Sequence, residues 1–203
     1  MPAQALSVRA SIAARLTDAV LELAGRVPAS SVAASDDPEH KARAITSVAC
    51  KKAAAISAGL AMPPGPWGLV TVIPDLAIIW DLQARMVADI AAVYGQSASL
   101  GREHMLWCLF KHTGAQAFRD FVVRSGERWL VKKASLAVIQ SAAQMIGIKL
   151  SQQAISKGAS RFVPIVGAVG VGLYAYRDTR EVSRAAIELF SKMRADAVAP
   201  ELR

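Results

Sequence analysis

Residues 63–95 read PPGPWGLVTVIPDLAIIWDLQARMVADIAAVYG, and this stretch decides most of the fold. Its first six residues hold three prolines and two glycines, which cannot continue a helix and therefore predict a fixed turn. The apolar run that follows predicts a helix with Pro74 in its first turn, continuing to Tyr94. Gly95 is expected to end that helix as a C-terminal cap.

The segments on either side of this stretch are also helical in pattern. Val70, Val72 and Ile73 alternate briefly as in a strand, but no other segment alternates strictly enough to pair with them. The sequence therefore predicts an all-α protein, with about seven or eight helices in one compact bundle around two apolar segments broken by glycine and proline. Besides the helix ending at Tyr94, the predicted helices span residues 5–26, 38–61, 100–112, 114–124, 127–145 (with a bend at Gly147), 149–159 and 177–197.

The domain organisation follows from a polar linker near the N-terminus. Residues 28–37 (PASSVAASDD) separate the amphipathic helix 5–26 from a helix that starts at Pro38, with Asp36 or Asp37 as its cap. We therefore expect residues 1–36 to form an N-terminal helix and linker, and residues 37–198 to form the main helical domain.

The composition is unusually apolar for a chain with a net positive charge. Of the 203 residues 53% are hydrophobic, the net charge is +8, and the mean hydropathy is +0.31. The apolar excess is concentrated in Ala53–Trp80 and Phe162–Tyr176, the first broken by prolines and the second only 15 residues long. Each is too broken or too short for a simple transmembrane span, which needs about 20 consecutive apolar residues. They are either core helices, which we expect to pack against each other, or segments that dip into a membrane.

The sequence also bears on the compartment. The cysteines Cys50 and Cys108 do not make a disulfide framework and suit free thiols in a reducing compartment. The first 26 residues lack the apolar run of a secretory signal. We therefore expect a cytoplasmic protein. We also expect no cofactor.

The positive charge lies in the second half of the chain, chiefly between residues 102 and 161. Within it, residues 119–133 (RDFVVRSGERWLVKK) interleave apolar and basic side chains, as in a segment that lies on an anionic membrane with its tryptophan at the interface. The alternative is a core-facing helix with a basic outer face. No motif for sequence-specific nucleic-acid recognition is present. The candidate membrane- or lipid-contacting residues are Arg119, Arg124, Arg128, Trp129, Lys132, Lys133 and Trp67.

Asp75 is the candidate functional acid, because it is a carboxylate inside an apolar run and needs a partner or a shifted pKa there. Two other interpretations stay open. It caps the helix beside Pro74, or it forms a buried ion pair with Arg161 or Arg177.

His104, Cys108 and His112 form a weak candidate metal site. Their i, i+4, i+8 spacing places them on one stripe of a helix, where neighbouring pairs could chelate a metal. The outer two lie about 12 Å apart along the axis, so one ion cannot easily bind all three. We therefore expect a partly buried polar stripe and no metal.

Two pieces of the chain, residues 63–95 and residues 157–190 (KGASRFVPIVGAVGVGLYAYRDTREVSRAAIELF), resemble the EcsC family over about residues 40–195. The resemblance implies a bacterial helical protein linked by name to the neighbourhood of an ABC transporter, and it implies no established catalytic activity. The positions that match the family pattern are Pro74, Asp75, Gln83, Tyr94, Gly95, Pro164, Gly167 and Ala168.

We therefore expect a non-enzymatic helical protein at the inner face of the cytoplasmic membrane, in the role of a transporter accessory. The alternative is a soluble module that binds a lipid-like apolar ligand or self-associates through an apolar surface. The third hypothesis is an enzyme that uses Asp75 or the His104/Cys108/His112 stripe.

Overall fold

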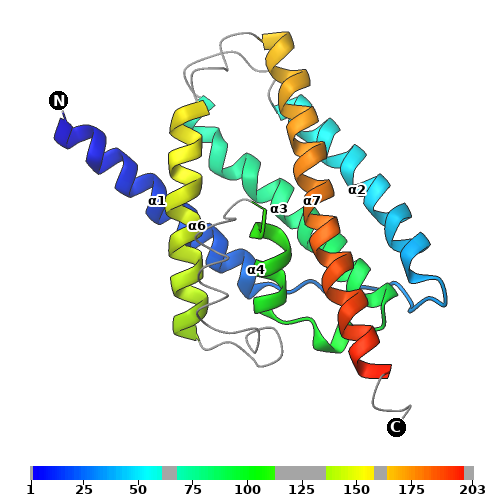
Figure 1. Ribbon diagram of the computed structural model, residues 1–203. Helices are drawn as coiled ribbons and strands as arrows, with labels where there is room; N and C mark the ends of the chain where they lie inside the picture. Colours follow the sequence, from blue (N-terminus) through cyan, green and yellow to red (C-terminus); the bar gives the residue numbers. More distant parts are fainter. Residues whose placement is uncertain (1, 61–67, 113–135, 158–163, 199–203) are drawn as a thin grey trace.

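The computed structural model describes residues 2–60, 68–112, 136–157 and 164–198 (Figure 1). This part of the chain is all helical and contains no strand, which confirms the predicted fold class with slightly fewer helices than expected. The elements are α1 (Pro2–Gly25), α2 (Pro38–Leu60), α3 (Gly68–Val93), the 3-10 turn η1 (Ser97–Ser99), α4 (Arg102–Phe110), α6 (Leu136–Lys157) and α7 (Pro164–Val198).

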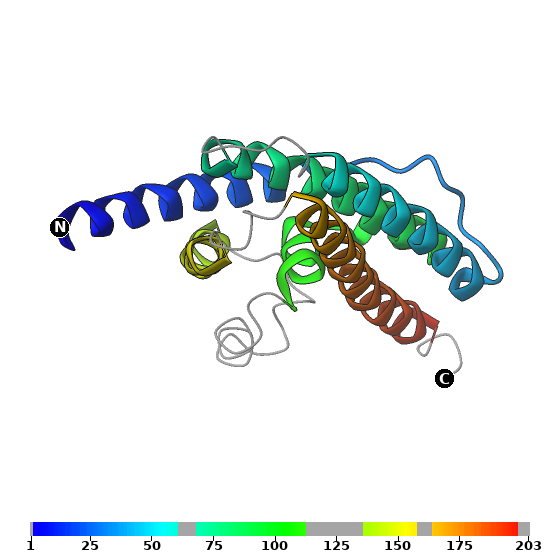
Figure 2. The same cartoon turned by 90° about the horizontal axis from the view of Figure 1, so that it is seen from above.

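The described α-helices form two layers of three (Figure 2). One layer contains α1, α3 and α2, and the other contains α6, α4 and α7. Across the layers α6 packs on α1, and α7 packs on both α2 and α3. The central helix α3 is buried from Met86 to Ala88 and from Ile90 to Val93, where it packs against neighbouring helices of both layers.

Two predicted helix boundaries are confirmed in atomic detail. At the start of α2, the Asp37 carboxylate accepts a hydrogen bond of 3.2 Å from the His40 amide, as an N-cap side chain does. At the end of α3, Gly95 has φ +75° and donates to the Ala92 carbonyl at 2.9 Å, while Gln96 donates to the Ala91 carbonyl at 2.7 Å. These two bonds are the Schellman pattern, which needs a residue in the left-handed region and so favours glycine.

The beginning of α3 departs from the prediction. The helix starts at Gly68, so Pro74 lies inside it and not in its first turn, and the brief strand at residues 70–73 is helix. Asp75 is eight residues into the helix and cannot cap its start, which rules out the capping interpretation. The turn that we predict before it falls on residues 61–67, outside the described chain.

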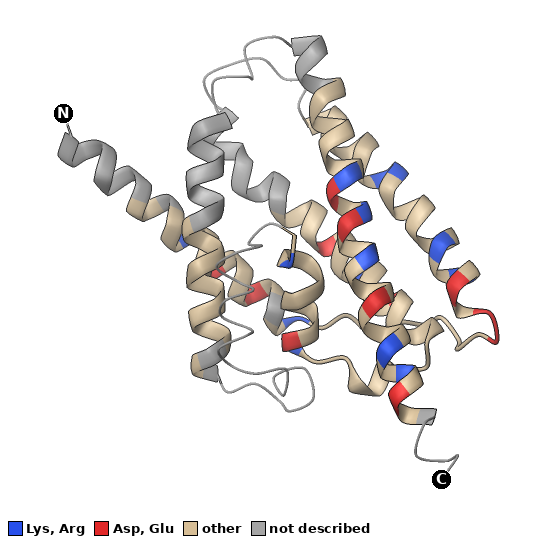
Figure 3. Cartoon of the chain, viewed as in Figure 1, with Lys and Arg blue, Asp and Glu red and all other residues tan. Residues whose placement is uncertain are grey.

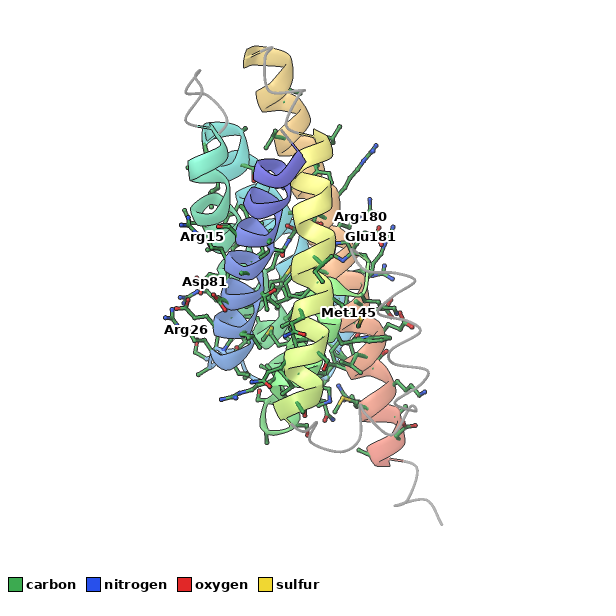
Figure 4. The ribbon with its side chains drawn as sticks, turned by 90° about the vertical axis from the view of Figure 1, so that its left-hand side faces the viewer. Arg15, Arg26, Asp81, Met145, Arg180 and Glu181 are labelled. Atoms are coloured by element: carbon green, nitrogen blue, oxygen red, sulfur yellow. The ribbon has the colours of Figure 1, made fainter. Side chains whose placement is uncertain are left out.

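Gly147 does not bend its helix. α6 runs through it from Leu136 to Lys157, joining what the sequence suggested were two helices. A methyl group at Gly147 would overlap Thr17 Oγ1 and lie 2.9 Å from both the Ala13 carbonyl oxygen and the Thr17 amide nitrogen. The glycine therefore allows α6 to approach the backbone of α1, and the two helices lie side by side in Figure 4.

The linker between α1 and α2 is held against the rest of the molecule. Ser30 Oγ donates to Asp89 Oδ1 at 2.6 Å, and the Ser35 amide donates to the Val93 carbonyl at 3.0 Å. Arg194, near the end of α7, donates to the Ser35 carbonyl at 3.1 Å. Through Leu16 and Val20, α1 also contributes to the same core as the later helices.

The two apolar segments pack against each other where they are described, as predicted. Ala53, Ile79 and Ala175 form one buried cluster from α2, α3 and α7. Gly172 brings α7 close to α2, since a methyl group there would lie 3.0 Å from the Ala54 carbonyl oxygen. The described part of the chain holds no helix with the length and hydropathy to cross a bilayer.

Candidate functional site

The described residues test only some of the candidates. Arg119, Arg124, Arg128, Trp129, Lys132, Lys133 and Trp67 all lie outside the described chain, as do the predicted helix 114–124 and the beginning of the predicted helix 127–145. Asp75 is placed in the backbone of α3, but its side chain is not among those described.

His104, Cys108 and His112 have separate roles. His104 is buried, and its Nδ1 accepts a hydrogen bond of 3.0 Å from the Gly101 amide at the start of α4. Cys108 is fully buried, and this burial raises the pKa of its thiol far above the usual value, so it stays protonated. Among the described residues no three His, Cys, Asp or Glu side chains are grouped so that they could hold a metal ion.

His112 instead belongs to a polar cluster where three helices meet. Its Nε2 lies 2.7 Å from Asp178 Oδ1 on α7. Gln83 on α3 donates from Nε2 to Asp178 Oδ2 at 2.8 Å and to Thr179 Oγ1 at 3.1 Å. Gln83 and Thr179 are buried, and Asp178 is 17% exposed, so the cluster links α3, the end of α4 and α7 within an otherwise apolar core.

The sequence contains a signal for this cluster in the polar residues at core positions of α3 and α7. Gln83 follows Ile79 and Trp80 on the buried face of α3 at helical spacing, and Thr179 and Ser183 are similarly placed on the buried face of α7. A polar residue at a core position needs a partner, because its desolvation is costly otherwise. Such positions therefore predict hydrogen-bonded neighbours without identifying them.

A second polar feature is a groove of about 610 Å³ between the antiparallel helices α2 and α7. Its α7 side is formed at helical spacing by Tyr176, Arg180, Ser183, Arg184, Ile187 and Glu188, and its α2 side by Glu39, Arg43, Thr46, Ser47 and Cys50. Thr46 donates to the Ala42 carbonyl at 2.7 Å and is hydrogen-bonded to Ser183, which joins the two helices across the groove.

Cys50 lies on the floor of this groove. The residue is almost completely buried, and burial raises the pKa of its thiol, an effect that the nearby positive charge of Arg180 partly opposes. Cys50 is a free thiol, as is Cys108, in agreement with the prediction that the two do not form a disulfide. The remaining proton makes Cys50 a poor nucleophile.

The third feature is an apolar end to the α2/α7 pair. Neither residues 53–60 of α2 nor residues 164–176 of α7 contain a charge. Figure 3 shows that the charged residues of both helices lie away from this end. The pairing of Gly172 with Ala54 and Ala58 places the end of α2 beside the beginning of α7. Large apolar side chains are exposed there, with Val169 67% exposed and Leu173 and Tyr174 each 52% exposed.

Comparison with known proteins identifies the class of protein. The model of the EcsC protein family matches residues 37–195, which cover all the described helices except α1. The chain therefore belongs to the EcsC family. A search of the curated proteins and a search of the solved structures each found no match.

Proposed function

We propose that this protein is a non-enzymatic, peripheral membrane protein that binds the anionic inner face of a bacterial cytoplasmic membrane through the apolar end of α2 and α7. In this proposal its role is that of an accessory to a transporter, as the family resemblance implies. The observation that carries the proposal is the order of the exposed side chains along these two helices. They are apolar at the end that α2 and α7 share, and cationic further from that end.

The apolar part of this surface consists of exposed side chains that lie close together, not of single scattered ones. Val169 and Leu173 are one turn apart on α7, and Leu60 at the end of α2 is 37% exposed. Exposed apolar residues that cluster in this way are typical of a binding surface. Interfacial segments bury their apolar side about 5–10 Å into the boundary between headgroups and acyl chains.

The cationic part lies at the depth that lipid headgroups would occupy. Lys52 is eight residues before Leu60, and Arg177 is eight residues after Val169, so each lies about 12 Å from the apolar end along its helix. Lys51, Lys52 and Arg177 are exposed, and none forms an ion pair within the described chain. Each such charge near an anionic leaflet contributes about 1 kcal/mol to binding.

Vesicle flotation tests the proposal. We expect the full chain to float with vesicles that contain phosphatidylglycerol and not with pure phosphatidylcholine vesicles. Replacing both Val169 and Leu173 by serine should lower the partition coefficient about tenfold or more, because each apolar side chain contributes on the order of 1 kcal/mol when it is half transferred from water.

Ile148 on α6 provides the matched control, because it is 52% exposed, as Leu173 is, but lies on another helix. Ile148→Ser should leave flotation unchanged. Absence of binding to either kind of vesicle would refute the proposal. An equal loss in Leu173→Ser and Ile148→Ser would place the membrane contact elsewhere.

Self-association through the same apolar end is the alternative that this surface also supports. It predicts a dimer in the absence of lipid, which light scattering after size-exclusion chromatography would detect. If Leu173→Ser converts such a dimer to a monomer while vesicles do not bind the wild type, the apolar end is a protein interface.

A further inference from the structure

The groove between α2 and α7 has one positive charge that the described chain does not balance. Arg43 pairs with Glu39, Arg184 pairs with Glu181, and Lys111 Nζ pairs with Glu188 Oε2 at 2.7 Å. No described carboxylate lies within ion-pair distance of Arg180. Figure 4 labels Arg180 and Glu181 on α7 at the outer edge of the molecule.

Hydroxyl groups from both helices line the groove with Arg180. Tyr176 is one turn before Arg180 on α7, and Ser47 is on α2, one turn before the Cys50 thiol. In the described chain neither the Tyr176 nor the Ser47 hydroxyl makes a hydrogen bond. Within the described chain the groove therefore presents one guanidinium without an ion pair and two hydroxyl groups without a hydrogen bond, from two sides.

These donors fit a singly charged, tetrahedral oxyanion. An arginine fork binds the two unesterified oxygens of a phosphodiester, and each of these oxygens can accept a further hydrogen bond from a hydroxyl donor. A single uncompensated arginine balances one negative charge. This single charge describes a phosphodiester better than a doubly charged phosphomonoester.

The groove also continues into the apolar end. At 100° per residue, Val169, Leu173, Tyr176 and Arg180 lie within a 60° arc of α7, so one stripe of the helix passes from exposed apolar side chains to the groove. Arg180 is about 16 Å from Val169 along the helix axis. A ligand with an apolar part and a phosphodiester could therefore contact both.

We infer that the α2/α7 groove is a binding site for the phosphodiester group of an anionic amphiphile, with Arg180 as its charge partner and Ser47 and Tyr176 as further donors. The inference deepens the proposed function, because it names the lipid group that the protein would recognise at the membrane. The same chemistry is also present in free glycerophosphodiesters, so the experiment must separate the two sources.

Isothermal titration calorimetry of the full chain with soluble probes isolates the groove from the membrane surface. The probes are dihexanoyl-phosphatidylglycerol below its micellar concentration and glycerophosphoglycerol, which has no acyl chains. We expect both to bind, the acylated probe more tightly. Arg180→Gln should raise the dissociation constant about tenfold or more, as expected for the loss of charge-assisted hydrogen bonds.

Lys192→Gln is the matched control, because it removes one positive charge from an exposed side chain of the same helix that does not line the groove. It should change the affinity for the soluble probes less than about twofold, a difference of under about 0.4 kcal/mol. Equal losses in Arg180→Gln and Lys192→Gln would overturn the inference, since general surface charge would then explain binding. Circular dichroism of each variant should match that of the wild type, because both side chains are exposed.

The combined results with soluble probes and vesicles separate this inference from the proposed function. Binding of phosphatidylglycerol vesicles with no binding of either soluble probe would overturn the groove and leave membrane association standing. Binding of the soluble probes, lost in Arg180→Gln, with no vesicle binding would support the groove and refute membrane association. In that case the ligand is a free phosphodiester.

Discussion

The same substitution, glycine to alanine, should have opposite effects on stability at two positions in the helices. In a helix interior, alanine is more favourable than glycine by about 1 kcal/mol, because it loses less backbone entropy on folding. The structure determines whether the added methyl group opposes this gain. At Gly170 on α7 no described atom outside the adjoining turns of the helix lies within 4 Å of the position of the new Cβ, so we expect Gly170→Ala to stabilise the protein by about 0.5–1 kcal/mol.

At Gly147 the methyl group meets the backbone of α1. Its nearest neighbours include the Ala13 carbonyl oxygen and the Thr17 amide nitrogen, each 2.9 Å away, and these atoms can move only if the whole helix moves. Overpacking of this kind typically costs about 1–3 kcal/mol, and here a rigid contact favours the upper part of that range. After subtraction of the helix gain, Gly147→Ala should lower the free energy of unfolding by about 1–2 kcal/mol.

At Gly172 the space for an added methyl group is intermediate between those at Gly170 and Gly147. Its added methyl group would lie 3.0 Å from the Ala54 carbonyl oxygen and 3.3 Å from the Ala58 Cβ, so a small shift of α7 relieves the contact. The cost and the helix gain should nearly cancel, leaving Gly172→Ala within about 0.5 kcal/mol of the wild type.

Urea unfolding followed by circular dichroism at 222 nm measures all three variants, with the slope of the transition checked for constancy. The order expected is Gly170→Ala most stable, Gly172→Ala intermediate and Gly147→Ala least stable. A Gly147→Ala variant as stable as the wild type would refute the packing of α6 on α1. Faster amide exchange confined to α1 in this variant would show that the helix detaches locally.

Three further predictions concern the core and a helix end. Asp178→Ala should lower the free energy of unfolding, measured in urea titrations, by about 2–4 kcal/mol, because it removes the carboxylate that binds Gln83 and His112. Asp178→Asn should lower it less, because the asparagine keeps an acceptor for Gln83. Burial raises the pKa of Cys108, so the folded state keeps the thiol proton that the unfolded chain releases above about pH 8.5. Stability should therefore fall above that pH, by up to about 1.4 kcal/mol per unit from this group, and Cys108→Ala should reduce the slope of a stability–pH curve by that amount. Gly95→Ala should lower the thermal midpoint, by the equivalent of about 1 kcal/mol, because its φ of +75° is unfavourable for a residue with a Cβ; an unchanged midpoint would contradict the cap.

The features that could be predicted from the sequence depend on a few neighbouring residues. The start of α2 at Asp37 and Pro38 and the end of α3 at Gly95 are determined by hydrogen bonds within one turn of the helix. The same is true of the amphipathic stripes, because their period is a property of the helix itself. These signals were sufficient for the fold class.

The features that could not be predicted depend on residues far apart in the chain. A glycine in a helical pattern indicates either a bend or a close approach, and only the position of Thr17 on another helix shows that Gly147 is the second kind. Likewise, the partners in the polar cluster come from positions 83, 112 and 178, and a single sequence contains no information on which distant residues are neighbours. Pro74 is placed in a helix interior despite an intrinsic cost of about 3 kcal/mol, so tertiary context outweighs local propensity there.

The position of α1 has a consequence for how relatives of this protein are delimited. The family match begins at residue 37, yet Leu16 and Val20 lie in the core, and Gly147 packs on the backbone of a helix outside the match. The residues that match the family are thus fewer than the residues that form the core. A fragment trimmed to residues 37–195 would lose α1 and with it one wall of its interior.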